Sequence, residues 1–166
     1  FINFKTNYQF INKIHDFFKY DKTLPETLLQ EYLYFGGYPK VVLANTIEEK
    51  INKIKEIYNS YVEKDIQNLI HIEKTENFIN LVSVLSSQIG QLVNRTELSQ
   101  TLNIDRETLK TYLWYLEKTF IIKRINPFFS NIRKELTKMP VFYFTDIGLR
   151  NYNRNQLITP PDKTDG

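Results

Sequence analysis

The stretch VNRTELSQTLNIDRETLKTYLWYLEKTFIIKRIN, residues 93–126, decides the fold that the sequence predicts. It holds two helical patterns separated by a turn at Asn103, because asparagine tolerates a left-handed backbone. Asn94 or Thr96 is expected to cap the first helix, and Asp105 the second. Such side-chain oxygens accept the free amide groups of a first helical turn. The stretch therefore predicts a helix-turn-helix.

The second helix of this motif has one apolar and one polar face. The apolar residues recur three and four positions apart, as in a helix that packs on a core, and they are Leu109, Tyr112, Leu113 and Leu116. The opposite face carries Arg106, Lys110, Thr111 and Trp114. Residues 120–125 and 139–144 are rich in β-branched and aromatic side chains, so we expect an antiparallel hairpin. These elements favour a winged helix-turn-helix, whose second helix can enter the major groove of DNA.

The remainder of the chain predicts further helices. Apolar residues three and four positions apart indicate helices over residues 6–20, 23–35, 47–70 and 78–90. Gly36 and Gly37 are expected to end the second of these, since glycine readily adopts positive φ at a helix C-terminus. Thr46 and Glu49 have the spacing of a capping box. Asp146 is expected to cap a last short helix.

The predicted fold class is mainly α: a helical bundle followed by a winged helix-turn-helix with a small antiparallel β-hairpin. We expect a helical region over residues 1–75 and the winged helix-turn-helix over residues 76–152. Residues 153–166 are polar and rich in proline, which is typical of a disordered tail or linker.

Composition narrows the protein class. The 166 residues are 42% hydrophobic, enough for a core, and include no cysteine, which excludes disulfides and cysteine-ligated metals. No apolar run reaches the roughly 18 residues that span a bilayer. Residues 1–5 lack the features of a signal peptide, so a cytoplasmic location is expected. Because the sequence does not begin with Met, we expect it to be a piece of a longer protein.

Basic residues concentrate around the helix-turn-helix. The net charge is +3, and residues 91–140 carry nine Lys or Arg against five Asp or Glu. A basic surplus of this kind favours contact with phosphate groups. The predicted DNA-binding residues are Arg95, Arg106, Lys110, Thr111, Lys123, Arg124, Arg133 and Lys134. Trp114 predicts a protein interface instead, because a large apolar ring on an exposed face suits a protein contact.

No catalytic site is predicted. The sequence lacks the glycine-rich phosphate-binding loop of nucleotide hydrolases and the nucleophile motif of α/β-hydrolases. His15 and His71 lie far apart without the spacing of metal ligands, and both are expected to be ordinary helix residues. Asp146 follows a predicted strand, where a metal-dependent nuclease can place a carboxylate, but the role of a helix cap is favoured. We therefore expect no enzyme activity, metal or cofactor in this chain.

An ordered set of short motifs resembles one known family. The motifs are FGGYP at residues 35–39, KDI at 64–66, LKTYL at 109–113, PVFYF at 140–144 and DIGLR at 146–150. In this order they resemble prokaryotic AAA-type ATPases that carry the C-terminal domain of unknown function 4143. The likeness extends over nearly all of residues 24–152.

The resemblance implies that a P-loop ATPase core, using ATP and Mg²⁺, would precede this region. A nuclease-like domain would follow it, and neither part lies in this chain. The resemblance supplies no catalytic residue for this sequence.

Two functions stay open at this point. In the first, the region is a non-catalytic connector that binds its own ATPase and C-terminal domains or a sister subunit. In the alternative, the winged helix binds double-stranded DNA. No membrane partner is expected in either case.

Overall fold

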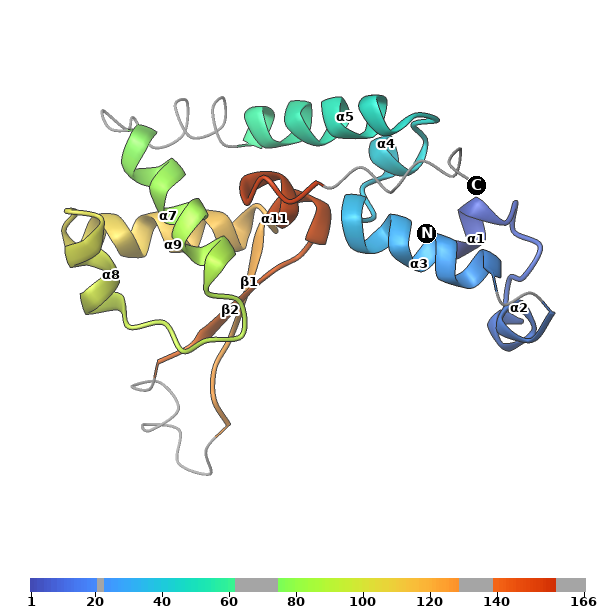
Figure 1. Cartoon of the computed structure of the whole chain (residues 1–166). Helices are drawn as coiled ribbons and strands as arrows, with labels where there is room; N and C mark the ends of the chain where they lie inside the picture. Colours follow the sequence, from blue (N-terminus) through green and yellow to red (C-terminus); the bar gives the residue numbers. More distant parts are fainter. Residues whose placement is uncertain (21–22, 62–74, 129–138, 158–166) are drawn as a thin grey trace. The chain divides into compact units, whose positions relative to one another are not determined.

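The computed structural model describes residues 1–20, 23–61, 75–128 and 139–157 (Figure 1). Contacts divide the chain into two compact units. Unit 1 contains residues 1–57 together with the residues from 146 onward, and unit 2 contains residues 58–145. The described fold is mainly helical with a two-stranded antiparallel sheet, as the sequence predicts.

Unit 1 is built from short helices. They are α1 (Ile2–Lys5), α2 (Ile14–Tyr20), α3 (Thr23–Phe35), α4 (Pro39–Val42), most of α5 (Ile47–Asn59) and α11 (Ile147–Asn153). The last of these, α11, packs against α3 although it lies more than a hundred residues further along the chain. Gly36 has a φ of 76° directly after α3, so the predicted helix end is confirmed.

The predicted helix over residues 6–20 is confirmed only over residues 14–20, as α2, and is wrong for residues 6–13. Turns separate α1 from α2, and three residues in them adopt the left-handed conformation: Asn7 (φ 50°), Tyr8 (φ 60°) and Asn12 (φ 60°). Asparagine tolerates this conformation better than most residues, so the two asparagines favour turns over a continuous helix. Apolar spacing alone could not reveal this break.

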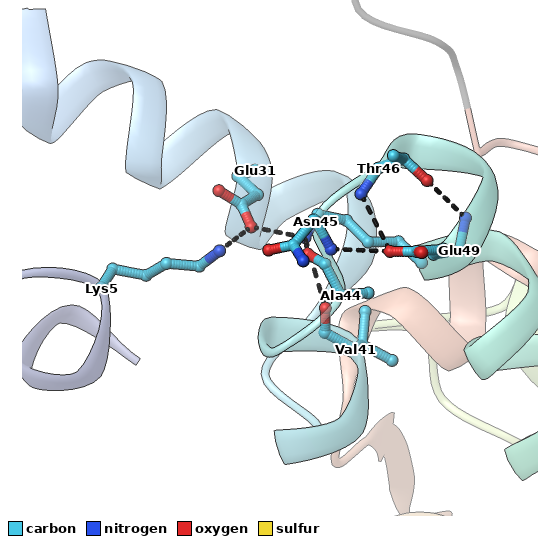
Figure 2. A network of polar contacts seen from close by, with 8 residues as sticks. Lys5, Glu31, Val41, Ala44, Asn45, Thr46 and Glu49 are labelled. Carbon is cyan, nitrogen blue, oxygen red and sulfur yellow. Dashed lines mark hydrogen bonds and ion pairs between the residues drawn. The ribbon is translucent and has the colours of Figure 1, made fainter.

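A network of polar contacts organises the start of α5 (Figure 2). The capping box is confirmed, because Thr46 Oγ1 accepts the Glu49 N–H at 3.1 Å and Glu49 Oε2 accepts the Thr46 N–H at 3.3 Å. One turn further on, Lys50 has a side chain that is only 7% exposed. Its Nζ donates to the carbonyl oxygens of Val41, at 3.3 Å, and of Ala44.

Glu31 completes the environment of Lys50. Its Oε1 lies 3.2 Å from Lys50 Nζ and 2.8 Å from Lys5 Nζ, so α3 is joined by ion pairs to both α1 and α5. Burial lowers the pKa of Lys50, while the carboxylate of Glu31 opposes that effect. The ammonium group is thus held by one carboxylate and by two carbonyls at the end of α4.

The substitution Lys50→Met is expected to reduce the free energy of unfolding by about 1–3 kcal/mol, because it removes the ammonium donor from the Val41 and Ala44 carbonyl oxygens and from the Glu31 carboxylate. Lys53→Met is the matched control, since the ion pair of Lys53 with Glu56, at 2.9 Å, is exposed. The control should change stability by less than about 1 kcal/mol. Urea unfolding of the three proteins measures the difference, and equal effects of the two substitutions would contradict the structural role of Lys50.

The described part of unit 2 contains three helices and both strands. They are α7 (Thr75–Ser87), α8 (Arg95–Thr101), α9 (Arg106–Lys118), β1 (Ile122–Ile125) and β2 (Val141–Phe144). The strands lie side by side and antiparallel, with Ile122 opposite Phe144 and Ile125 opposite Val141 (Figure 1). The predicted pairing of these two segments is confirmed.

The predicted helix caps around the turn are also confirmed. Asn94 Oδ1 accepts the Thr96 N–H at 3.0 Å, and Asp105 Oδ1 accepts the Thr108 N–H at 2.8 Å. Hydrogen bonds from Thr108 lower the pKa of Asp105. Asn103 has a φ of 50°, which reverses the chain between α8 and α9. Local sequence signals therefore specify this part of the fold.

The core of unit 2 lies between α7, α8 and α9. Phe78 is fully buried, and its ring meets those of Tyr112 and Tyr115 edge to face, with centroids 5.2 Å and 6.1 Å apart. The predicted apolar face of α9 is buried in this core. The segment before α8 pairs with β2, because Leu92 bridges to Val141 and the Val93 N–H donates to Pro140 O at 2.9 Å.

Several predictions lie outside the described residues. They are the continuation of the long helix over residues 62–70, the tail over residues 158–166, and the sites Arg133, Lys134 and His71. In the part of the chain that is described, no helix combines the length and apolar character needed to cross a membrane.

Candidate functional site

A hollow of about 190 Å³ opens on unit 2 beside the exposed face of α9. Residues of α8, α9, β1 and the segment of β2 surround it, and they are Arg95, Lys110, Leu113, Trp114, Glu117, Arg124, Pro140 and Phe142. We call these eight residues the α9 hollow. Leu113, Pro140 and Phe142 are buried, so the interior is apolar, whereas the charged side chains come from residues that reach solvent.

Helical spacing aligns three of these side chains. Lys110, Trp114 and Glu117 follow one another four and three residues apart on α9, so they form a stripe along one helix face. Arg95 is the first residue of α8, beside the Asn94 cap. Arg124 points to the same side of β1 as the buried Ile122, because side chains alternate along a strand.

The structure brings together some of the predicted site residues. Arg95, Lys110 and Arg124 meet around Trp114 in the α9 hollow. Lys123 is exposed on β1 and is not among the hollow residues, and neither are Arg106 and Thr111, although they share the exposed side of α9. The remaining predicted residues, Arg133 and Lys134, are not described.

Trp114 is the most exposed aromatic side chain of α9. It is 57% exposed, and the ammonium group of Lys118 lies 5.9 Å from its ring centre. A cation near an indole face is attracted by the π electrons, which favours an exposed orientation of the ring. An exposed indole beside an apolar hollow offers a contact surface for another molecule.

Four residues of the α9 hollow were not predicted as site residues. Leu113 was predicted only on the buried apolar face of α9. Glu117 belongs to the Lys110 and Trp114 stripe, and its helical spacing was a usable signal. Pro140 and Phe142 join the site only through the register of β2 against β1 and through the bridge from Leu92. That pairing is not encoded in a local pattern, so sequence reasoning could not group these two with α9.

The charged side chains of the α9 hollow make modest contacts within the described chain. Lys110 Nζ lies 3.3 Å from Glu107 Oε2, and both side chains are more than two-thirds exposed. Such a pair is weak because water screens it. Arg124 Nε donates to Asn126 Oδ1 at 2.9 Å. Both cations therefore reach the surface at the edge of an apolar cavity, where they can meet acidic groups of a partner.

Asp146 has a structural position in unit 1. Its Oδ1 accepts the Leu149 N–H at 3.1 Å, so the predicted cap of α11 is confirmed. Its Oδ2 accepts the Gly37 N–H at 2.7 Å, which ties α11 to the end of α3. Asn151 reinforces this junction, because its Nδ2 donates to Leu33 O at 2.8 Å. We call these contacts the α3–α11 clasp.

Stability should depend on pH through Asp146. Burial raises its pKa above the ordinary 3.8, although backbone N–H groups of Gly37 and Leu149 oppose the effect. The native state then binds the proton more tightly than the unfolded chain. The carboxyl group's contribution to stability is complete below the unfolded pKa and is lost as pH rises through the raised native pKa.

Asp146→Asn removes this titration and keeps a side chain that caps helices well. We compare the unfolding free energy of the wild-type protein with that of the variant. The wild-type value minus the variant value should fall as pH rises from roughly 3 to roughly 7. Urea unfolding at several pH values measures this difference. A difference that grows with pH would contradict the raised pKa.

No group of three His, Asp or Glu side chains that could hold a metal ion occurs among the described residues. His15 is exposed on α2. The described residues thus form a mainly helical structure. Unit 2 combines a helix-turn-helix with a two-stranded sheet, and the hollow between them has an apolar interior and a basic rim.

The model of one family, described as a domain of unknown function (DUF8612), matches residues 26–157. The chain belongs to this family. It is 29% identical over 135 residues to an uncharacterised protein of Haemophilus influenzae, and this match covers 78% of this chain and 33% of the relative. It is 25% identical over 114 residues to an uncharacterised protein of Mycobacterium tuberculosis, covering 69% of this chain and 26% of the relative. No solved structure matches.

The chain therefore spans about a third of the Haemophilus relative and about a quarter of the mycobacterial one. The resemblance to AAA-type ATPases with the domain of unknown function 4143 is wrong, because the matching family is DUF8612 and the relatives' names indicate no ATPase. Two residues of the motifs behind it have structural roles in this fold. Gly36 ends α3 and Asp146 caps α11. The ATPase parent, with its ATP and Mg²⁺, is therefore withdrawn.

Proposed function

We propose that unit 2 is a non-catalytic winged-helix module that binds a protein partner through the α9 hollow. The partner would be another domain of its own protein or a sister subunit. The order α7, α8, α9, β1 and β2, with the segment before α8 bridging to β2, supports the winged-helix assignment. Winged helices are not restricted to DNA, so the surface of the module must decide its partner.

The observation that carries a protein partner is the exposed Trp114 at the edge of an apolar hollow. Tryptophan beside a pocket is typical of the residues that dominate binding energy in protein interfaces. Two acidic residues share this side of α9: Glu107 is 83% exposed, and Glu117 lines the hollow.

The second candidate function is binding of double-stranded DNA. It is favoured by the three cations of the hollow, because Arg95, Lys110 and Arg124 come from α8, α9 and the hairpin. In a helix-turn-helix that binds DNA, the second helix enters the major groove while neighbouring parts contact phosphates.

Two measurements on the whole chain separate the candidates. The first is titration against duplex DNA at about 50 mM and about 200 mM salt. If the three cations each engage a phosphate, affinity should fall by about 40-fold between these concentrations. The second is sedimentation velocity, which detects self-association with a sister subunit.

For a protein partner, we expect no DNA binding at low salt. If that partner is a sister subunit, we also expect self-association that Trp114→Ala abolishes. Phe120→Ala is the control, because Phe120 is 76% exposed but is not part of the hollow. Salt-dependent DNA binding that is lost with Lys110→Ala and kept with Trp114→Ala would overturn the proposal in favour of DNA.

A further inference from the structure

The α9 hollow has the size for one bulky apolar side chain. Its volume is about 190 Å³, and an apolar protein cavity of about 150 Å³ is able to hold benzene. Leu113, Pro140 and Phe142 are buried around it, and Trp114 adds an exposed indole. Aromatic rings pair well edge to face with an indole, so a phenylalanine or leucine side chain suits this space.

The charged side chains at the rim of the hollow are mostly cationic. Among the described residues the rim has three cationic side chains, from Arg95, Lys110 and Arg124, and one carboxylate, from Glu117, while Glu107 adds a second carboxylate 3.3 Å from Lys110. Lys118 adds a fourth cation close to the Trp114 ring. A partner segment with carboxylates on both sides of an apolar anchor is therefore complementary to the rim, whereas a basic segment is repelled.

We propose that the α9 hollow binds an acidic protein segment that inserts one bulky apolar side chain, with its carboxylates against Arg95, Lys110 and Arg124. This inference rests on the proposed function and specifies the chemistry of the partner. The anchor supplies most of the affinity, because it removes apolar surface from water. The rim charges select the segment and speed its association.

Trp114 provides a direct reporter, since it is the single tryptophan of the sequence. The whole chain is titrated, at low salt, with three blocked twelve-residue peptides that lack tryptophan. The first has a central Phe among Glu and Ala residues, the second replaces that Phe by Ala, and the third replaces each Glu by Lys. A blunt 20-base-pair DNA duplex is titrated in parallel.

The acidic Phe peptide is expected to shift the Trp114 emission in a saturable way. Loss of the Phe anchor and reversal of the peptide charge should each weaken binding at least about tenfold. Lys110→Glu should weaken the acidic peptide and strengthen the basic one. Lys110 is an exposed residue, so the variant keeps the fold. Lys123→Glu, an exposed change outside the hollow, should leave both affinities unchanged.

Each other result overturns the inference in a distinguishable way. Equal binding of acidic and basic Phe peptides would refute the charge selection but leave the protein-binding function in place. An emission change with DNA and with no peptide would overturn both the inference and the proposed function. The absence of any change with all three peptides would refute the acidic segment as the partner.

Discussion

The substitution Gly148→Ala is expected to lower the free energy of unfolding of unit 1 by about 3 kcal/mol. A methyl group on Gly148 would overlap the carbonyl group of Phe35 and come within 2.9 Å of Gly36 N. Both are backbone atoms, so no side-chain rotation relieves the overlap. The whole α11 helix must move away from α3, and the α3–α11 clasp is then lost.

Gly37→Ala is the matched control because it lies in the same clasp. A methyl group there meets the ring of Tyr32 at 3.1 Å, and that ring can rotate. We expect a change of about 1 kcal/mol or less. Urea unfolding followed by far-ultraviolet circular dichroism measures both variants. Equal unfolding midpoints for the two would contradict the close backbone approach at Gly148.

The second large effect is expected in unit 2, where Phe78→Ala should reduce the free energy of unfolding by about 3–5 kcal/mol. Phe78 is fully buried, and the variant leaves a cavity beside Tyr112 and Tyr115. Trp114 emission follows the unfolding of unit 2 selectively, because the sequence has no other tryptophan.

The control for this prediction is again an aromatic residue of unit 2. Phe120 is 76% exposed, and Phe120→Ala should change stability by about 0.5 kcal/mol or less. If the two substitutions shifted the Trp114 transition by the same amount, Phe78 would not be the centre of the core.

Sequence reasoning predicts the helix-turn-helix well because its signals are local. The caps Asn94 and Asp105 and the left-handed Asn103 each act within a few residues, and the structure has all three as predicted. The buried face of α9 follows directly from helical spacing. Turn residues were the weak point, since the break at Asn7 and Asn12 interrupts a pattern that looked continuous.

Long-range pairing could not be predicted. The Gly37 N–H reaches Asp146 across 109 residues, and nothing near either residue identifies the other. The candidate site has the same limitation. Lys110 and Trp114 were recognisable on one helix face, whereas Phe142 joins them only through the sheet register. The sequence therefore predicted some of the site residues, but it could not predict the hollow that they form.

The interrupted layout of unit 1 has a consequence for biosynthesis. The residues that close the α3–α11 clasp are made only after all of residues 58–145 have been translated. A ribosome releases the chain from its N-terminus, and domains generally fold as units once they emerge. Unit 2 is a continuous segment, so it is complete first, and the N-terminal helices must wait for α11 before their own unit can close.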